Sequence, residues 1–242
     1  MTKRSNRRRR ISWPLIAGGL LLIAAALSLT GYNLWDDSRA GQVNKEILAE
    51  LIPEIPEGIP TPEPLQKAML TAWEKREAEK PERSVTMEEA VSITPQPEIR
   101  YPYYMLDPNM KMPVKTVNGF DYVAKLEIPV LELELPVMDN WDYKKLQYAP
   151  CRYTGTPYLE NLVICAHNYK SHFGRNATLQ AGDEVIVTDM DGNVFRYEVA
   201  ETETLPSNAI AEMTAGEWPL TLFTCTVGGS ARVTVRCTSP KE

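Results

Sequence analysis

Near its C-terminal end the sequence reads Leu220-Thr-Leu-Phe-Thr-Cys225-Thr-Val-Gly228-Gly229-Ser-Ala-Arg232-Val-Thr-Val-Arg236-Cys237. Two β-favouring runs flank a Gly-Gly pair, which predicts a tight hairpin. In that hairpin Cys225 lies opposite Arg232, and opposed side chains share a face with Cβ atoms about 4.5–5.5 Å apart. Arg236, four residues further on, lies roughly 13 Å away at about 3.3 Å per residue. The register therefore predicts a thiol beside the Arg232 guanidinium, where a cation stabilises thiolate.

From Phe120 onward, short stretches of alternating apolar and polar residues are separated by turn residues. This pattern predicts an antiparallel sandwich or barrel over residues 119–242. Asp191-Gly192 predicts a second hairpin turn. Short helical segments are expected over 141–148 and 208–213. The expected strands cover residues 122–128, 131–138, 162–166, 184–189, 194–204, 219–226 and 232–238.

The N-terminus has a different character. Six Lys and Arg lie within residues 1–10, and the other 20 basic side chains face 32 acidic ones, so the rest of the chain carries a charge of −12. An acidic body argues against nucleic-acid binding. Residues 11–35 carry no charge, and as a helix they would span about 37 Å, enough to cross a bilayer. We expect an uncleaved membrane anchor with the basic residues 1–10 in the cytosol and the remainder outside. A cleaved signal peptide, with small residues at Ala24–Ala26, is the alternative.

Residues 36–118 resemble a spacer, because 11 of the 19 prolines fall between Pro53 and Pro113. Proline at that density excludes sheet and long helix. Two helical stretches, 42–51 and 65–80, interrupt the segment, and we expect both to be exposed surface helices. The spacer would hold the C-terminal domain away from the membrane.

His167 is the candidate proton donor for a reaction at the Cys225 thiol. It directly follows the apolar strand Leu162-Val-Ile-Cys-Ala, so a rigid sheet can orient it. A thiolate that expels an amine requires a proton donor, and histidine is the usual one. A Cys and a His in a β domain are nevertheless more often packing or surface residues than a catalytic pair.

Taken together, these residues make the sequence resemble the sortases. In that family a histidine follows a hydrophobic strand, the nucleophile ends a Thr-Leu-x-Thr-Cys signature, and an arginine lies on the next strand. Leu-Val-Ile-Cys-Ala-His167-Asn, Thr-Leu-Phe-Thr-Cys225 and Arg232 match in type and order. The resemblance implies a closed all-β barrel of about seven to eight strands with short helices, preceded by the membrane helix and the spacer.

The resemblance also implies the chemistry. Cys225 would cleave a Leu-Pro-x-Thr-Gly-like sorting signal between Thr and Gly, forming a thioacyl enzyme. His167 would move the proton, Arg232 would stabilise the oxyanion, and Thr224 would line the substrate cleft. The partners would be surface or pilin proteins with a sorting signal and an amine acceptor such as a cell-wall precursor or a pilin lysine. No cofactor is expected.

Subclass features point to the pilin-polymerising sortases without settling the class. The short Cys225–Arg232 connection and Ala-His-Asn are typical of them, and Asp107-Pro108-Asn109 stands where their Asp-Pro-aromatic lid precedes the barrel. Asp107 is accordingly a candidate lid residue facing Arg232, with an ordinary turn as the alternative.

Other polar and thiol residues have open interpretations. We expect His172 to be solvated or to face substrate. Calcium binding, known in some sortases, is an alternative to a solvated face for the acidic group Glu132, Glu134, Asp139 and Asp142. Cys165 is expected to be a buried apolar residue; zinc binding by Cys165 and His167 lacks a Cys-x-x-Cys pair. Cys151 and Cys237 are either free thiols or a disulfide.

Two further functions use the same fold. One is a catalytically silent tethered barrel that binds surface peptides or wall polymer. In such a barrel Cys225 would be no more reactive than Cys151 or Cys237. A hydrolase would use the same residues but release its product to water instead of an amine.

Overall fold

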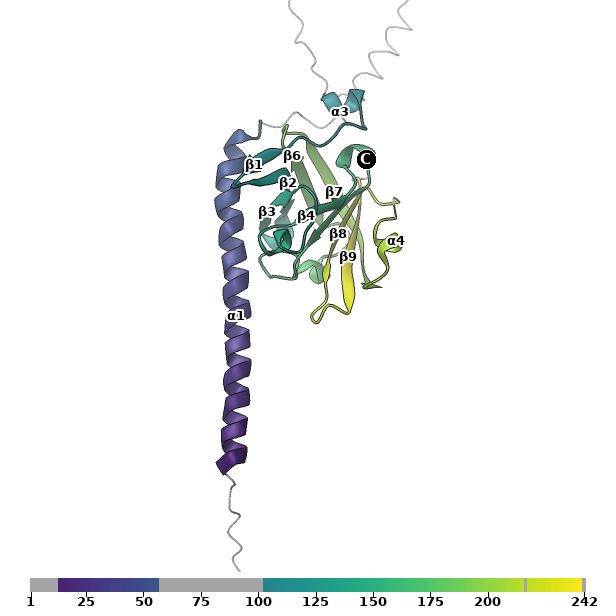
Figure 1. The fold of residues 1–242 in the computed structure, drawn as a ribbon. Coiled ribbons are helices and arrows are strands. Elements are labelled where there is room, and N and C mark those ends of the chain that lie inside the picture. Colours follow the sequence, from purple (N-terminus) through teal and green to yellow (C-terminus); the bar gives the residue numbers. More distant parts are fainter. Residues whose placement is uncertain (1–12, 57–101, 216, 241–242) are drawn as a thin grey trace, which may run out of the picture.

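The computed structural model describes residues 13–56, 102–215 and 217–240. From residue 115 onward the chain forms strands that close into a barrel (Figure 1). The tail predicted for residues 1–10 and the helix predicted for 65–80 lie outside the described residues. The strands are β1 (Lys115–Val117), β2 (Phe120–Ile128), β3 (Leu133–Met138), β4 (Cys151–Thr154), β5 (Leu162–Ala166), β6 (Glu184–Asp189), β7 (Val194–Pro206), β8 (Leu220–Cys225) and β9 (Ala231–Thr238).

The described strands are ordered β1-β2-β3-β4-β5-β8-β9-β7-β6. An additional pairing between β2 and β6 closes eight of them into a barrel, with β1 attached to β2. β3–β4 and β5–β8 are parallel, whereas the other pairs are antiparallel. This confirms the predicted closed all-β barrel with short helices.

Two apolar clusters lie on the two faces of this sheet. Alternate residues of β5 and β8, such as Ile164 and Leu222, fill the barrel interior. The residues between them, Val163, Cys165 and Phe223, belong to a second cluster on the outer face. The two-residue periodicity of strands thus gives β5 and β8 a buried residue on both faces.

Helix α1 (Trp13–Leu51) covers part of that outer face (Figure 1). Its buried residues are Ala40, Asn44, Ile47, Leu48 and Leu51, and Ile47 and Leu51 join the outer cluster. The expectation of an exposed surface helix over 42–51 was therefore wrong: the apolar stripe packs on the barrel. The N-terminal part of the same helix is apolar and long enough to cross a membrane, and none of that stretch is buried.

Short helical elements precede the first strand or lie between strands. They are η1 (Ile52–Glu54), α3 (Tyr103–Leu106), η2 (Pro129–Leu131), η3 (Lys145–Gln147), η4 (Pro157–Leu159), η5 (Asn176–Thr178) and α4 (Ile210–Met213). The strand predicted from residue 131 begins only at Leu133, because Glu132 adopts a left-handed conformation at φ 50°. The helix predicted over 141–148 shrinks to η3, since the Asp142 carboxylate accepts the Lys144 N–H at 2.7 Å and forms a turn instead.

Candidate active site

The β8–β9 hairpin has the register predicted from the sequence. Cys225 pairs with Arg232, and Thr221 pairs with Arg236. Gly228 and Gly229 adopt positive φ angles of 85° and 74° in the connecting turn, a conformation that glycine tolerates. The Arg232 guanidinium donates to the carbonyl oxygens of Gly229 and Ala231, both at 3.1 Å. Arg232 therefore lies at the turn beside Cys225.

His167 reaches the same place from the neighbouring strand. β5 and β8 run parallel, and their last register pair is Ala166 with Thr224. His167 and Cys225 are the next residues on each strand, so they emerge side by side where strands are about 4.8 Å apart. The Thr224 hydroxyl donates to the Ala166 carbonyl at 2.8 Å. This bond ties the two strand ends together directly before the His and the Cys.

Cys225, His167 and Arg232 all belong to the outer face of the barrel. Cys225 shares the strand face of Phe223, and Phe223 pairs with Cys165 in the outer cluster. Both Cys225 and His167 are partly exposed. Burial lowers the pKa of His167, and the nearby Asp36 carboxylate opposes that effect. The sheet thus presents an accessible thiol and an imidazole on one surface.

A pocket of about 200 Å³ opens at Cys225. Arg232, Thr224 and Cys165 line it beside the thiol, whereas His167 is not among its lining residues. Its other walls are mostly apolar and aromatic and come from the loop after β3, from β4, from β8 and from the α4 region; they include Trp141, Tyr143, Tyr153, Ile210, Met213 and Phe223.

The aromatic wall is built by stacking. The Trp141 and Tyr153 rings stack with centroids 5.5 Å apart, and Tyr143 meets Trp141 edge-on at 5.4 Å. Tyr153 in turn contacts Phe223 edge-on at 5.3 Å. Such pairs add stability beyond the area they bury.

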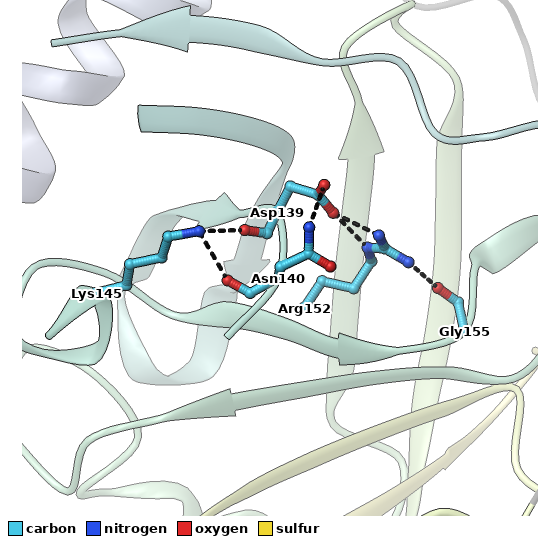
Figure 2. Close-up of polar contacts among 5 residues, drawn as sticks. All are labelled: Asp139, Asn140, Lys145, Arg152 and Gly155. Atoms are coloured by element: carbon cyan, nitrogen blue, oxygen red, sulfur yellow. Dashed lines mark hydrogen bonds and ion pairs between the residues drawn. The ribbon is translucent and has the colours of Figure 1, made fainter. Parts of the chain in front are cut away.

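A polar network fixes the loop that carries this wall (Figure 2). Arg152 donates to the Asp139 carboxylate from Nε at 2.8 Å and from a terminal nitrogen at 2.5 Å. Lys145 Nζ donates to the carbonyl oxygens of Asp139 and Asn140 at 2.9 and 3.1 Å. The ends of the loop are therefore held by charge-assisted bonds on both sides of Trp141 and Tyr143.

Arg236 has a structural environment that distinguishes it from Arg232. Only 3% of it is exposed, and it donates to Glu203 Oε1 at 2.8 Å, Thr221 Oγ1 at 3.1 Å and two carbonyls of the α4 region. Its donors are thus committed to holding β7, β8 and α4 together. Arg232 is the arginine that borders the pocket.

The other three cysteines are buried free thiols. Burial raises the pKa of Cys151 and of Cys237 to about 12, and it raises the pKa of Cys165 as well. Thiolate is the nucleophilic form. Among the four thiols Cys225 is the exposed one, and a Cys151–Cys237 disulfide is not formed.

Comparison with known proteins identifies the family of the barrel. Residues 126–239 match the family model of the Sortase domain. Residues 126–239 therefore form a sortase domain. A comparison with curated proteins gave no match.

Solved sortase structures are among those similar to the chain. Sortase A from Corynebacterium diphtheriae is 22% identical, with a TM-score of 0.46 over 51% of this chain and 62% of its own length. A Clostridium perfringens Sortase D5 is 22% identical (TM-score 0.45; 52% and 83%). Sortase C from Streptococcus pneumoniae is 24% identical (TM-score 0.44; 49% and 66%). The chain thus spans less than two thirds of the first of these structures.

The sortase domain departs from the sequence-based expectations at His172. This residue is fully buried, so the expectation of a solvated or substrate-facing side chain was wrong. Neither ring nitrogen has a hydrogen-bond partner among the described residues. Burial, with a smaller contribution from His167, lowers its pKa to about 4. His172 is a neutral core residue of the loop after β5.

Asp107 follows α3 as an exposed residue in a local turn. Its carboxylate accepts the Asn109 N–H at 3.1 Å, and α3 packs through Tyr104 against Tyr158 and Phe195 with centroids 4.9 and 5.3 Å away. α3 lies at the opposite end of the barrel from the β8–β9 turn (Figure 1). In this structure Asp107 forms the turn, and the expected pairing with Arg232 is not made.

The four acidic residues considered for calcium do not converge. Glu134 pairs with Lys125 at 3.3 Å, Asp139 with Arg152, and Asp142 accepts a backbone N–H. Within residues 13–56, 102–215 and 217–240, no group of three or more His, Cys, Asp or Glu is placed to hold a metal ion.

Two groups of residues at the candidate site were not predicted from the sequence. The aromatic wall residues Trp141 and Tyr153 carry no motif, although the density of aromatics over 141–153 was a signal. Asp36 and Asp37 were missed because residues 36–118 were interpreted as a spacer, and their contacts with Tyr169 and Ser171 were missed with them. The charged pair Asp36-Asp37 directly after the apolar run could have suggested a contact at the membrane boundary.

Proposed function

We propose that this protein is a membrane-anchored cysteine transpeptidase that acts on sorting signals of surface proteins. The observation that carries the proposal is the placement of Cys225 and His167 at adjacent strand ends, with Arg232 opposite Cys225 and an apolar pocket beside them. The match of residues 126–239 to the Sortase domain supports the reaction type.

The acylation step uses each of the three residues once. The Cys225 thiolate attacks the carbonyl carbon of the Thr residue in a Leu-Pro-x-Thr-Gly-like segment, forming a C–S bond and an oxyanion. Arg232 stabilises that oxyanion electrostatically. The C–N bond then breaks, His167 gives its proton to the leaving glycine amine, and a thioester remains on Cys225.

The transfer step reverses the proton movement. An acceptor amine attacks the thioester carbonyl, His167 takes one proton from that amine, and the Cys225 thiolate leaves. The new amide bond replaces the one that was broken, and no oxidant, metal or nucleotide enters the balance. Splitting one amide exchange into two acyl transfers is the gain from covalent catalysis.

The pocket suggests how the peptide would be oriented. Its aromatic wall, including Trp141 and Tyr153, suits the apolar Leu-Pro part of the signal, while the thiol at the pocket edge would meet the Thr carbonyl. We place the basic residues 1–10 in the cytosol and the barrel outside, because positive residues flank the cytoplasmic end of membrane helices.

The test uses the full chain in detergent micelles with a panel of sorting-signal peptides and hydroxylamine or triglycine as acceptor. Mass spectrometry should detect the peptide hydroxamate or the triglycine adduct, and Cys225→Ala should abolish both. Cys237→Ala removes a thiol far from the site and should retain the products.

Three other outcomes are informative. Release of only the free acid despite added amine would show a hydrolase. Binding of peptide without any product, together with alkylation of Cys225 no faster than that of the buried thiols, would show a silent binding barrel. No product and no binding with every peptide would contradict the proposal.

A further inference from the structure

The loop that carries His167 is wound tightly on itself. The Phe173 N–H donates to the His167 carbonyl at 3.2 Å, and the Gly174 N–H donates to the Tyr169 carbonyl at 2.8 Å. A Cβ atom at Gly174 would lie 2.4 Å from the Asn168 carbonyl oxygen, so only glycine fits there. Phe173 is fully buried. The loop is therefore a compact unit whose position fixes that of His167.

Helix α1 binds this loop through two consecutive carboxylates. The Tyr169 hydroxyl donates to Asp36. Asp37 accepts the Ser171 N–H at 3.0 Å and the Ser171 hydroxyl at 2.6 Å. The helix can approach so closely because Gly41 lacks a side chain: a Cβ there would lie 3.1 Å from the Ser171 Cβ.

Tyr169 connects the helix to the imidazole. Its ring lies against His167 with centroids 4.8 Å apart and planes tilted by 30°, while its hydroxyl is bonded to Asp36. The hydroxyl therefore fixes the ring, and the ring restricts the orientation of His167. The negative charge of the Asp36 carboxylate also favours the imidazolium form of His167 and so opposes the lowering of its pKa by burial.

Other charged and titratable groups surround the imidazole. On its own loop His172 is close enough to interact with it. Cys225 and Arg232 approach from β8 and β9. On α1, the positive charge of Arg39 works to lower the pKa of Tyr169. Asp37 accepts a hydrogen bond from Ser171 in the loop. Asp36 is the carboxylate of this set that acts on His167.

We propose that Tyr169 and Asp36 are positioning residues for His167, so that the helix carrying the membrane span is also part of the support of the active site. This inference rests on the proposed role of His167 in the transpeptidase. Asp36 follows the uncharged run directly, at the boundary of the span. The catalytic histidine is thereby oriented by the same helix that places the barrel at the membrane.

The first test does not depend on activity. The chain has only two histidines, so the full chain labelled with ¹³C at His Cε1, in micelles, gives two imidazole signals that His167→Ala assigns. Asp36→Asn should lower the pKa of His167, because it removes a carboxylate that stabilises the imidazolium. Glu46→Gln removes the same charge from an exposed position on α1 and should leave the His167 titration unchanged. Equal titration curves in all three proteins would overturn the inference.

The second test measures the orientation of His167. Tyr169→Phe keeps the ring against His167 but loses the hydrogen bond to Asp36. We expect kcat for peptide acylation to fall about tenfold with KM unchanged, since misorientation affects the chemical step. Unchanged kcat in Tyr169→Phe, in a preparation whose wild type acylates normally, would overturn the inference. A wild type that never acylates would contradict the proposed function, while the titration would still decide the role of Asp36.

Discussion

At the scale of single residues, burial separates groups of the same chemical type. Cys225 is partly exposed at a strand end, whereas burial raises the pKa of Cys151 and Cys237 to about 12. His167 is half-buried beside Cys225, while His172 is fully buried five residues later. Arg232 borders the pocket, while Arg236 is enclosed by hydrogen bonds. For each of these residue types, one accessible residue lies at the site and the buried ones named here support the fold.

The buried His172 makes stability depend on pH. Its folded pKa of about 4 lies below the ordinary value of about 6.5, so the unfolded chain binds the proton more readily. The resulting contribution is fully present above about pH 6.5 and is lost as pH falls towards 4. For a fully buried group it amounts to roughly 3 kcal/mol across that window.

Urea unfolding of the full chain in micelles at pH 7 and pH 4.5 measures this effect. We expect His172→Gln to lose less stability than wild type between the two pH values. The difference between the two proteins isolates His172 from the carboxylates, which titrate in both. Parallel losses in wild type and variant would contradict a neutral buried His172.

At the scale of elements, the parallel pair β5–β8 and helix α1 determine the site. The parallel register brings two chain segments that are 58 residues apart to the same edge. α1 then covers the outer face next to them. Leu51, only 1% exposed, and Ile47, 4% exposed, are the apolar contacts that hold the helix there.

Truncating one of these contacts should loosen α1 selectively. Leu51→Ala deletes a buried side chain, a change that costs about 2–5 kcal/mol. Hydrogen exchange of the full chain in nanodiscs should show faster exchange over residues 36–51 with β5 and β8 still protected. Glu46→Ala, an exposed change on the same helix, is the control. Identical exchange in both variants would mean that α1 does not depend on this contact.

Many of the strands and the register of one hairpin could be predicted from the sequence. Alternation and turn residues gave β5 and β6 at their observed bounds, and the Gly-Gly turn gave the Cys225–Arg232 register. β1 and β4 were missed because three or four residues carry too little periodicity. The docking of α1 was missed because an apolar stripe on a helix does not state which surface it covers.

In the molecule as a whole, one helix connects the candidate membrane span to the candidate active site. α1 is continuous from Trp13 to Leu51, so the barrel is fixed beside the helix that carries the candidate membrane span. The β8–β9 turn points along α1 towards the N-terminal half of that helix (Figure 1). The end of the barrel that bears Cys225 is therefore the end nearer the proposed membrane.

The proposed function requires Cys225 to form a thioester with a peptide acyl group. The most direct measurement is tandem mass spectrometry of the full chain, quenched in acid soon after mixing with a sorting-signal peptide. We expect one added acyl group on Cys225 that hydroxylamine removes, and none on Cys151, Cys165 or Cys237. A chain that turns the peptide over while Cys225 stays unmodified, or that loses no activity in Cys225→Ala, would contradict the account.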